Sequence, residues 1–466
     1  MAVGKFKSYS LYIQGTELNA FYAWMGLPYF ALPENGVSLM IGQDITIYGD
    51  ELINVPIIND LKVTYNCAVG TQSGNNLIIS TIAENIGTHP CQITIKNGNR
   101  LIDTYLISIN ISAQKTSGII NILRIGDSTM GGEEIGIEIE NSLQNNTINF
   151  IGTQGTIRKH EGYPGKTFVW LATDALSPFV KAGVIDITAY FKDKNIATPD
   201  IVYLRLGIND SGSYIIRSDA HIDYIITNVD ALISAFLNFN SNLKVIVALP
   251  TTCENTGDGW NANYDESTNI QDWYLENIHH LQKALSDRYS NGLFNPRVKC
   301  SYEWIGLDRD NGYPKIDGKH SNGVHFSDAL QMGRGLAAYI NPEIKPLGVE
   351  LINQSLWATA PYWWSYNASA TFDGVKITNS GGVSTMLSAP HNIPINIGKT
   401  YRIEMTFTGS DALSFPFFTT GGDTVVYLPY APGTFVAYRV ATGPYFVFAS
   451  WNFVGTITKL SMREVL

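Results

Sequence analysis

The alternation of hydrophobic and polar residues divides the chain into three stretches. From about Leu39 to Ile111, apolar residues recur at every second position, and Gly and Asn turns separate the runs. Short alternating strands with such turns predict an antiparallel β-sandwich. We therefore expect an all-β domain over residues 1–115, with the small, polar segment 113–118 as its linker to the next stretch.

The middle stretch, from Ile119 to about Pro342, alternates apolar strands with longer helical periods. Apolar residues recur every three or four positions, for example at Ile135, Ile139 and Leu143, which predicts helices with one buried stripe. Such alternation indicates a parallel sheet covered by helices on both faces, which we place in a domain of residues 116–345. The predicted strands are 119–125, 148–151, 201–206, 243–249 and 298–305.

After Pro346 the helical periods end and period-two alternation returns. This pattern predicts a second all-β module over residues 346–466, most simply a jelly-roll sandwich. Its aromatic residues are dense near the start, where Trp357, Trp363 and Trp364 stand close together. These aromatic side chains either present their ring faces to a sugar or belong to the hydrophobic core of the module.

Composition narrows the class of protein. Of 466 residues, 15% are charged, 12% are aromatic and 42 are Gly, which is typical of a β-rich protein built for an extracellular setting. The net charge of −10, without any basic run, argues against a nucleic-acid partner. We see no signal peptide and no uninterrupted apolar run of membrane-spanning length. The four Cys residues lack metal-site spacing and read as buried thiols rather than a disulfide framework.

Polar motifs follow the predicted strands of the middle domain at their carboxyl ends. Because the carboxyl ends of parallel strands open onto one crevice, we expect these motifs to meet there. A fourth polar segment precedes the last predicted helix, 328–340. The motifs are Gly126-Asp127-Ser128, the segment 160–167 with Gly165, the segment 207–210 with Asn209, and the segment 317–327 with Asp317, His320, Asn322 and His325.

These residue types supply what ester hydrolysis needs. A Ser hydroxyl is a weak nucleophile, so a His must accept its proton during attack and return a proton to the leaving alcohol. The oxyanion then needs fixed donors, which the N–H groups of Ser128 and Gly165 and the Asn209 amide would supply. Asp127 is expected to fix the turn by hydrogen bonds rather than to act as a base.

In this order the motifs resemble the SGNH (GDSL-like) hydrolase family over about half of the chain. The resemblance implies a flavodoxin-like three-layer α/β domain with esterase activity and no cofactor or metal. It places the nucleophile on Ser128, the oxyanion donors on Ser128, Gly165 and Asn209, and the base on His325. The Gly-x-Ser-x-Gly elbow of α/β-hydrolases is absent.

The flanking modules carry resemblances of their own. The N-terminal sandwich is similar to the Ig-like modules found before SGNH domains in gut bacterial and bacteriophage proteins. The C-terminal module is similar to carbohydrate-binding jelly rolls and to terminal sandwiches of phage tail proteins. These resemblances imply an extracellular or virion-associated protein, and they leave open a homo-oligomer and the binding of a cell-surface glycan by the C-terminal aromatics.

The fourth motif departs from the family at Asn322, where the family has an Asp three residues before its His. Asn322 orients His325 but cannot stabilise its positive charge. In serine proteases with a Ser-His-Asp triad, replacing the triad aspartate by asparagine costs ~10⁴ in turnover. Three arrangements stay open: a carbonyl or another carboxylate assists His325; Asp317 is that carboxylate; or Asp317 and His320, which share the same spacing, are the true pair. We favour His325, because it leads directly into the last helix.

The segment 250–264 follows the fourth strand and should overhang the same crevice. Trp260 and Tyr264 in it either stack on sugar faces or pack the loop. We therefore predict a serine esterase that removes O-acyl, most plausibly O-acetyl, groups from a polysaccharide. The alternative is a non-catalytic glycan-binding adhesin or tail structural protein on the same fold, and a lipase is disfavoured because no long apolar lid is present.

Overall fold

In the computed structural model the described residues begin at residue 36, and the chain forms two compact units. The first comprises residues up to 116 and 120–343, and the second comprises 117–119 and 344–466. The described residues are 36–52, 61–115, 118–130, 133–144, 146–212, 217–264, 270–290, 292, 294–327, 329–350, 363–365, 370–372, 377–380, 384–388, 395–410, 417–419, 433–441, 443, 445–450 and 454–466.

The N-terminal part of the first unit contains two small β-sheets. One sheet has the order β1-β7-β6-β3, in which β7 pairs antiparallel with β6 and parallel with β1. The other has the order β2-β5-β4 and is antiparallel. The bounds are β1 Val37–Met40, β2 Ile45–Ile47, β3 Leu61–Cys67, β4 Gly70–Ser73, β5 Asn76–Ile79, β6 Gly87–Asn97 and β7 Arg100–Ser112, with a 3-10 turn at Ala83–Asn85.

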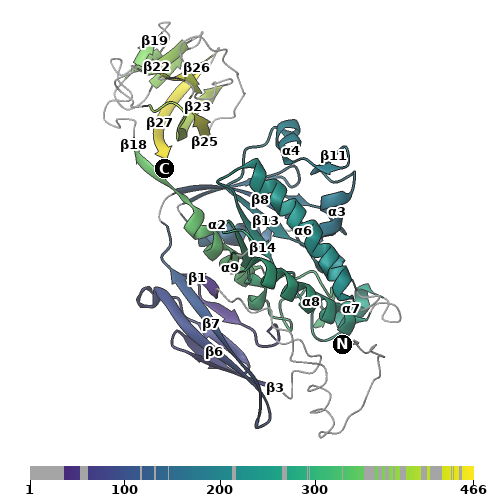
Figure 1. Cartoon of the computed structure of the whole chain (residues 1–466). Helices are drawn as coiled ribbons and strands as arrows, with labels where there is room; N and C mark the ends of the chain where they lie inside the picture. Colours follow the sequence, from purple (N-terminus) through teal and green to yellow (C-terminus); the bar gives the residue numbers. More distant parts are fainter. Residues whose placement is uncertain are drawn as a thin grey trace. The chain divides into compact units, whose positions relative to one another are not determined.

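A parallel sheet forms the centre of the first unit (Figure 1). β8 pairs in parallel with β13, β13 with β14 and β14 with β15, while β9 and β10 pair with β8. The resulting order β9-β8-β13-β14-β15 is the flavodoxin-like doubly wound order. The bounds are β8 Gly118–Gly126, β9 Asn146–Ile151, β10 Glu161–Gly162, β13 Ile201–Arg205, β14 Lys244–Ala248 and β15 Val298–Ser301.

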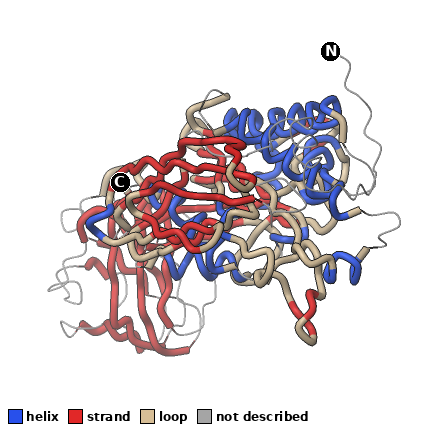
Figure 2. Tube along the Cα trace, turned by 90° about the horizontal axis from the view of Figure 1, so that it is seen from below, coloured by secondary structure: helices blue, strands red, loops and turns tan. Residues whose placement is uncertain are grey.

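Helices cover both faces of this sheet (Figure 2). All α-helices of the described residues lie between Glu134 and Ile340. α2 and α9 contact each other on one face, and α6 contacts α3, α4 and α8 on the other. The bounds are α2 Glu134–Ser142, α3 Phe168–Thr173, α4 Ile187–Lys194, α5 Ile208–Ser211, α6 Asp219–Phe239, α7 Asp258–Asn263, α8 Gln271–Tyr289 and α9 Leu330–Ile340. Two two-stranded ladders, β11 Val180–Lys181 with β12 Val184–Ile185 and β16 Lys315–Ile316 with β17 Lys319–His320, complete this part.

α6 is long and apolar enough to cross a membrane by length and composition alone. Its apolar residues form a stripe that the fold already uses, because Ile222, Ile225, Val229 and Leu232 are all buried. Core helices of globular domains pass the same two criteria. The stripe therefore accounts for the helix as one layer of the three-layer domain.

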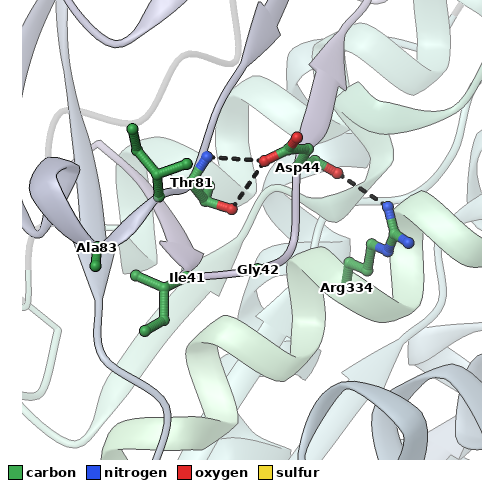
Figure 3. Close-up of a pocket in the computed structure, with 7 residues that line it drawn as sticks. Ile41, Gly42, Asp44, Thr81, Ala83 and Arg334 are labelled. Atoms are coloured by element: carbon green, nitrogen blue, oxygen red, sulfur yellow. Dashed lines mark hydrogen bonds between the residues drawn. The ribbon is translucent and has the colours of Figure 1, made fainter.

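The N-terminal sheets pack directly on the α/β part. Asp44 lies beside α9, where its carbonyl accepts a hydrogen bond from Arg334 at 3.1 Å and its carboxylate accepts from the N–H and hydroxyl of Thr81 (Figure 3). Further along, the buried Glu51 carboxylate accepts a hydrogen bond from the Thr252 hydroxyl at 2.7 Å. These contacts make residues 36–115 part of the same compact unit as the parallel sheet.

The second unit consists of antiparallel strands in two sheets. One contains β18, β27, β21 and β20, with β23 paired to both β27 and β25, and the other has the order β19-β22-β26-β24. The bounds are β18 Lys345–Glu350, β19 Trp363–Ser365, β20 Ala370–Phe372, β21 Ile377–Ser380, β22 Ser384–Ser388, β23 Thr400–Ser410, β24 Phe417–Thr419, β25 Gly433–Val440, β26 Tyr445–Ser450 and β27 Val454–Val465.

The predicted fold class is confirmed: a central α/β domain with a parallel sheet is flanked by separate β-sheets on both sides in sequence. The last predicted strand, 298–305, is shorter than expected, since Glu303–Gly306 forms a 3-10 turn after β15. The domain boundaries, the Ig-like and jelly-roll resemblances and the role of the C-terminal aromatics stay predictions. Trp357 and the side chains of Trp363 and Trp364 lie outside the described residues.

Candidate active site

β8 delivers Ser128 to the carboxyl edge of the parallel sheet. The strand ends at Gly126, where an added Cβ would lie 2.7 Å from the Arg205 carbonyl oxygen, so the neighbouring strand approaches too closely for any side chain. A 3-10 turn, η3 (Ser128–Met130), follows at once. The Asp127 carboxylate fixes this turn by accepting hydrogen bonds from the Thr129 N–H at 2.9 Å and hydroxyl at 2.8 Å.

Burial perturbs the two carboxyl groups beneath this turn. Asp127 is 1% exposed, and burial raises its pKa although the hydrogen bonds from Thr129 oppose the shift. Burial also raises the pKa of Asp210 to about 7, against hydrogen bonds from the Phe168 N–H. The nucleophile turn thus rests on carboxyl groups held in place by main-chain donors rather than by ion pairs.

The structure brings Ser128, His325 and Asn322 together. The Ser128 Oγ lies 2.7 Å from His325 Nε2. On the other side of the imidazole, His325 Nδ1 lies 3.2 Å from Asn322 Oδ1. A hydroxyl, an imidazole and an amide oxygen are therefore in line, the arrangement that an activated serine needs, although Ser128 and His325 lie 197 residues apart along the chain.

The surrounding main chain fixes which end of the Asn322 amide faces His325. The same Asn322 atom accepts hydrogen bonds from the Val324 N–H at 3.0 Å and the His325 N–H at 2.8 Å. Only the amide oxygen accepts a hydrogen bond, so the oxygen faces the imidazole. His325 Nδ1 must then carry the proton, and Nε2 keeps its lone pair for the Ser128 hydroxyl.

Three N–H donors lie at the strand ends around Ser128. Within the described part of the chain, the main-chain N–H groups of Ser128 and Gly165 have no acceptor. The Asn209 side-chain amide donates one hydrogen to the Lys166 carbonyl at 3.0 Å, which ties the Gly165 segment to α5 and leaves its second hydrogen unused. Such unused, fixed donors are what a developing oxyanion requires.

Gly165 has the backbone conformation that its position needs. Its φ is +73°, a left-handed value that favours glycine, and an added Cβ would meet no atom within 4 Å. The segment is anchored by β10, where Gly162 pairs with Gly126 and the Tyr163 N–H donates to the Gly126 carbonyl at 2.9 Å. The space beside Gly165 is therefore open to a substrate.

A pocket of about 310 Å³ opens on the His325 side of Ser128. Its wall combines the nucleophile and base with Glu134 and Ile135 of α2 and with Phe326 and Ser327. A larger pocket of about 470 Å³ lies where Asp44 and Thr81 face Arg334, and it holds neither a nucleophile nor a base (Figure 3). The smaller pocket is thus the one that contains the Ser128 hydroxyl and the His325 imidazole.

The second predicted pair, Asp317 and His320, is not assembled. Asp317 is an exposed residue at the tip of the β16–β17 hairpin with a φ of +51°. His320 is 4% exposed, with Nδ1 2.9 Å from the Glu254 carboxylate and Nε2 2.8 Å from the Asp310 carbonyl. Because both ring nitrogens face acceptors, His320 offers no lone pair to a serine, and Asp317 reaches neither histidine.

Of the two roles left open for Trp260, stacking on a sugar or packing the loop, its surroundings favour packing. It is 1% exposed and lies in a core cluster with Tyr274 and Val324, so its ring faces are covered by protein. The ring of Tyr264 lies 4.5 Å from that of Trp260 and is partly buried against the same cluster. The segment 250–264 therefore supports the His325 loop from behind, because Val324 belongs to this core.

Sequence reasoning missed Glu254 and Glu134. Glu254 accepts hydrogen bonds from His320, Thr256 and the Trp260 N–H, which joins the segment after β14 to the β16–β17 hairpin. Its one sequence signal is that it is the only charged residue between Pro250 and Gly257. Glu134 gives no such signal, because an acidic residue in the first turn of a helix is common and stabilising.

Neither a metal site nor a disulfide is found among the described residues. No group of three or more His, Cys, Asp or Glu in the described ranges is placed to hold a metal ion. Cys67, Cys91, Cys253 and Cys300 are free thiols, three of them buried.

Comparisons with known proteins bear on the fold. No protein-family model matches the sequence, and no curated protein matches it at a significant level. Among solved structures, the chain is similar to a lipase/acylhydrolase from Enterococcus faecalis, with 15% identity over 49% of this chain and 98% of that chain and a TM-score of 0.30. It is also similar to Est24, a carbohydrate acetylesterase from Sinorhizobium meliloti, with 18% identity over 47% and 98% and a TM-score of 0.31. A family 3 carbohydrate esterase from Talaromyces cellulolyticus shares 18% identity over 48% and 95%, with a TM-score of 0.28. Each of these matches covers about half of this chain.

Proposed function

We propose that this protein is a serine esterase that hydrolyses O-acyl esters through an acyl-enzyme on Ser128. The observation that carries the proposal is the 2.7 Å contact between Ser128 Oγ and His325 Nε2, with Nδ1 directed at the Asn322 oxygen. We further propose that the acyl group is acetyl and that it is carried by an extracellular or virion-accessible polysaccharide. The proposed substrate rests on the β-rich modules and on the acidic, weakly charged composition.

The steps follow from the geometry. Ser128 Oγ attacks the ester carbonyl while its proton passes to His325 Nε2, and the N–H groups of Ser128, Gly165 and Asn209 receive the oxyanion. The C–O bond to the alcohol then breaks, and the His325 proton goes to the leaving oxygen. A water molecule, deprotonated by the same nitrogen, attacks the acyl-enzyme and releases the acid and free Ser128.

Asn322 is the feature that favours the non-catalytic alternative, and its hydrogen bonds weaken that argument. In the serine-protease template, the ~10⁴ cost of Asp-to-Asn arises because the imidazole takes the wrong tautomer. Here two main-chain donors hold the Asn322 oxygen toward Nδ1, so the productive tautomer is kept. What is lost is the negative charge, which slows the reaction without removing the base.

Hydrolysis of p-nitrophenyl acetate tests the proposal. We expect Ser128→Ala to lower kcat by at least ~10³-fold, because among the described residues Ser128 has the one hydroxyl that contacts His325 Nε2. Ser327→Ala, a serine in the same pocket without a contact to the base, is the matched control and should keep measurable turnover. Equal rates for wild type and Ser128→Ala would exclude the esterase and leave a glycan-binding role.

A further inference from the structure

The pocket beside Ser128 lies on the side where the alcohol half of an ester must sit. His325 Nε2 has to deliver its proton to the leaving oxygen, so the alcohol lies on the His325 side of the nucleophile. The acyl oxygen points the other way, toward Gly165 and Asn209, neither of which lines the pocket. At about 310 Å³ the pocket is at the small end of the range for ligand sites and suits a single small alcohol.

Two charges frame this pocket and limit what enters it. Glu134, an exposed residue, is the only acidic side chain among the described residues of the wall, and its carboxylate accepts hydrogen bonds but repels anions. Behind the wall, the Arg205 guanidinium carbon lies 4.6 Å from the centroid of the Phe326 ring. Arg205 is 2% exposed, so it covers the buried face of Phe326 and places a positive charge there.

The Arg205–Phe326 contact argues against a cationic alcohol. Quaternary ammonium groups are held by the faces of Phe, Tyr and Trp rings, and Phe326 is the only such residue in the wall as far as the structure describes it. Its ring already interacts with a guanidinium, whose charge would oppose a second cation. Glu134 disfavours an anionic alcohol in the same way. A neutral alcohol whose hydroxyl groups donate to Glu134 and pack against Ile135 and Phe326 meets neither penalty.

We infer that the pocket is a subsite for a neutral, polyhydroxylated alcohol, a single uncharged sugar unit, and that Glu134 determines this specificity by accepting its hydroxyl groups. This inference rests on the proposed esterase function and adds the class of the leaving alcohol. Hydrogen bonds to a charged acceptor are strong enough to change selectivity about tenfold or more.

The inference is tested with four acetate esters that differ only in the alcohol. They are p-nitrophenyl acetate, 6-O-acetylglucose, an acetylated glucuronic acid and acetylcholine. We expect kcat/KM of the wild type to be highest for the neutral sugar among the three aliphatic alcohols. Glu134→Ala should lower the ratio of kcat/KM for acetylglucose to that for p-nitrophenyl acetate by roughly tenfold. Glu134→Gln should reduce the discrimination between neutral and anionic sugar by a similar factor, because it removes the charge and keeps the shape.

Glu138→Gln, one turn further along α2 and outside the pocket wall, is the matched control and should leave both ratios unchanged. Far-UV circular dichroism and Tm of each variant show that α2 is intact. Unchanged ratios in both Glu134 variants, or faster hydrolysis of acetylcholine than of acetylglucose, would overturn the inference. A separate result, equal hydrolysis of p-nitrophenyl acetate by the wild type and by Ser128→Ala, would overturn the proposed function itself.

Discussion

Two histidines with the same local spacing lie five residues apart and have opposite surroundings. His320 follows Asp317 by three residues, and His325 follows Asn322 by three. His320 is buried, and both of its nitrogens face acceptors, the Glu254 carboxylate and the Asp310 carbonyl. His325 is only partly buried, and one nitrogen faces the Ser128 hydroxyl.

The difference teaches that spacing alone does not define a catalytic histidine. The pair with an aspartate at the expected position is the one whose aspartate is exposed on a hairpin tip, while the pair with the wrong residue type has the right contacts. A base needs one nitrogen lone pair directed at a nucleophile, and this depends on what the other nitrogen contacts. His320 instead joins two segments, which holds the His325 loop in place.

The largest expected effect separates the two histidines by activity. His325→Ala should lower kcat/KM for p-nitrophenyl acetate by ~10⁴ or more, because the base for Ser128 is removed. His320→Ala should lower Tm and retain part of the activity below that temperature. Activity and thermal unfolding measured on both variants check this, and our assignment is wrong if only the His320 variant is inactive.

The contact between Glu254 and His320 should contribute to stability in acid. Burial raises the pKa of Glu254, but hydrogen bonds from Thr256 and His320 outweigh this and hold the pKa below its ordinary value near 4.5. A depressed carboxyl pKa contributes stability that is complete above the ordinary value and is lost as the pH falls through the lowered one. Glu254→Gln should therefore unfold more easily at neutral pH, by about 1.5–3 kcal/mol, because its hydrogen bonds lose a charged acceptor, and should show a flatter loss of stability in acid.

Urea unfolding at pH 7 and at several values below 5 measures both effects. Glu84→Gln, an exposed residue of the N-terminal part, serves as control and should follow the wild-type curve. A Glu254→Gln curve that parallels the wild type at every pH would show that the pair makes no differential contribution.

Substitutions of Asn322 should change kcat/KM by an intermediate amount, downward for Asn322→Ala and upward for Asn322→Asp. Asn322→Ala removes the acceptor for His325 Nδ1 and two main-chain N–H groups, and should lower kcat/KM roughly 10–100-fold. Asn322→Asp keeps the acceptor and adds the charge, so it should raise kcat/KM, by far less than the ~10⁴ of the protease template, because the tautomer is already correct.

The pH–rate profile sharpens this test. The added carboxylate favours the protonated imidazole, so the acid limb of kcat/KM should move to higher pH in Asn322→Asp. A rise of 10⁴ or more in the Asp variant would mean that Asn322 does not hold the productive tautomer in the wild type.

The smallest expected effect concerns Trp260. Trp260→Phe keeps an aromatic ring in the cluster with Val324 and should cost about 1–2 kcal/mol of stability, with KM for acetylated sugar little changed. A large rise in KM without a loss of stability, measured by kinetics and urea unfolding together, would restore the sugar-stacking interpretation.

The sequence was sufficient for the fold class because strand and helix periods depend on local burial. The apolar run before Gly126 and the stripe at Ile135 and Ile139 lie in a strand and a helix as predicted. The burial of Trp260 and His320 could not be predicted from the sequence. The local sequence around an aromatic residue or a histidine in a loop is the same whether or not tertiary contacts cover its side chain. Glu254 shows the reason: its partners come from residue 320 and from its own loop, and no periodicity encodes that pairing.

The Glu51–Thr252 hydrogen bond bears on how such a chain can be recombined. Thr252 stands two residues before Glu254, so a carboxylate from the N-terminal sheets supports the very segment that clamps His320. Swapping residues 36–115 for another β-module would leave that hydroxyl facing a foreign surface and would loosen the segment that packs behind the His325 loop. Exchange of this module by gene fusion would therefore act as a mutation of the α/β part of the chain.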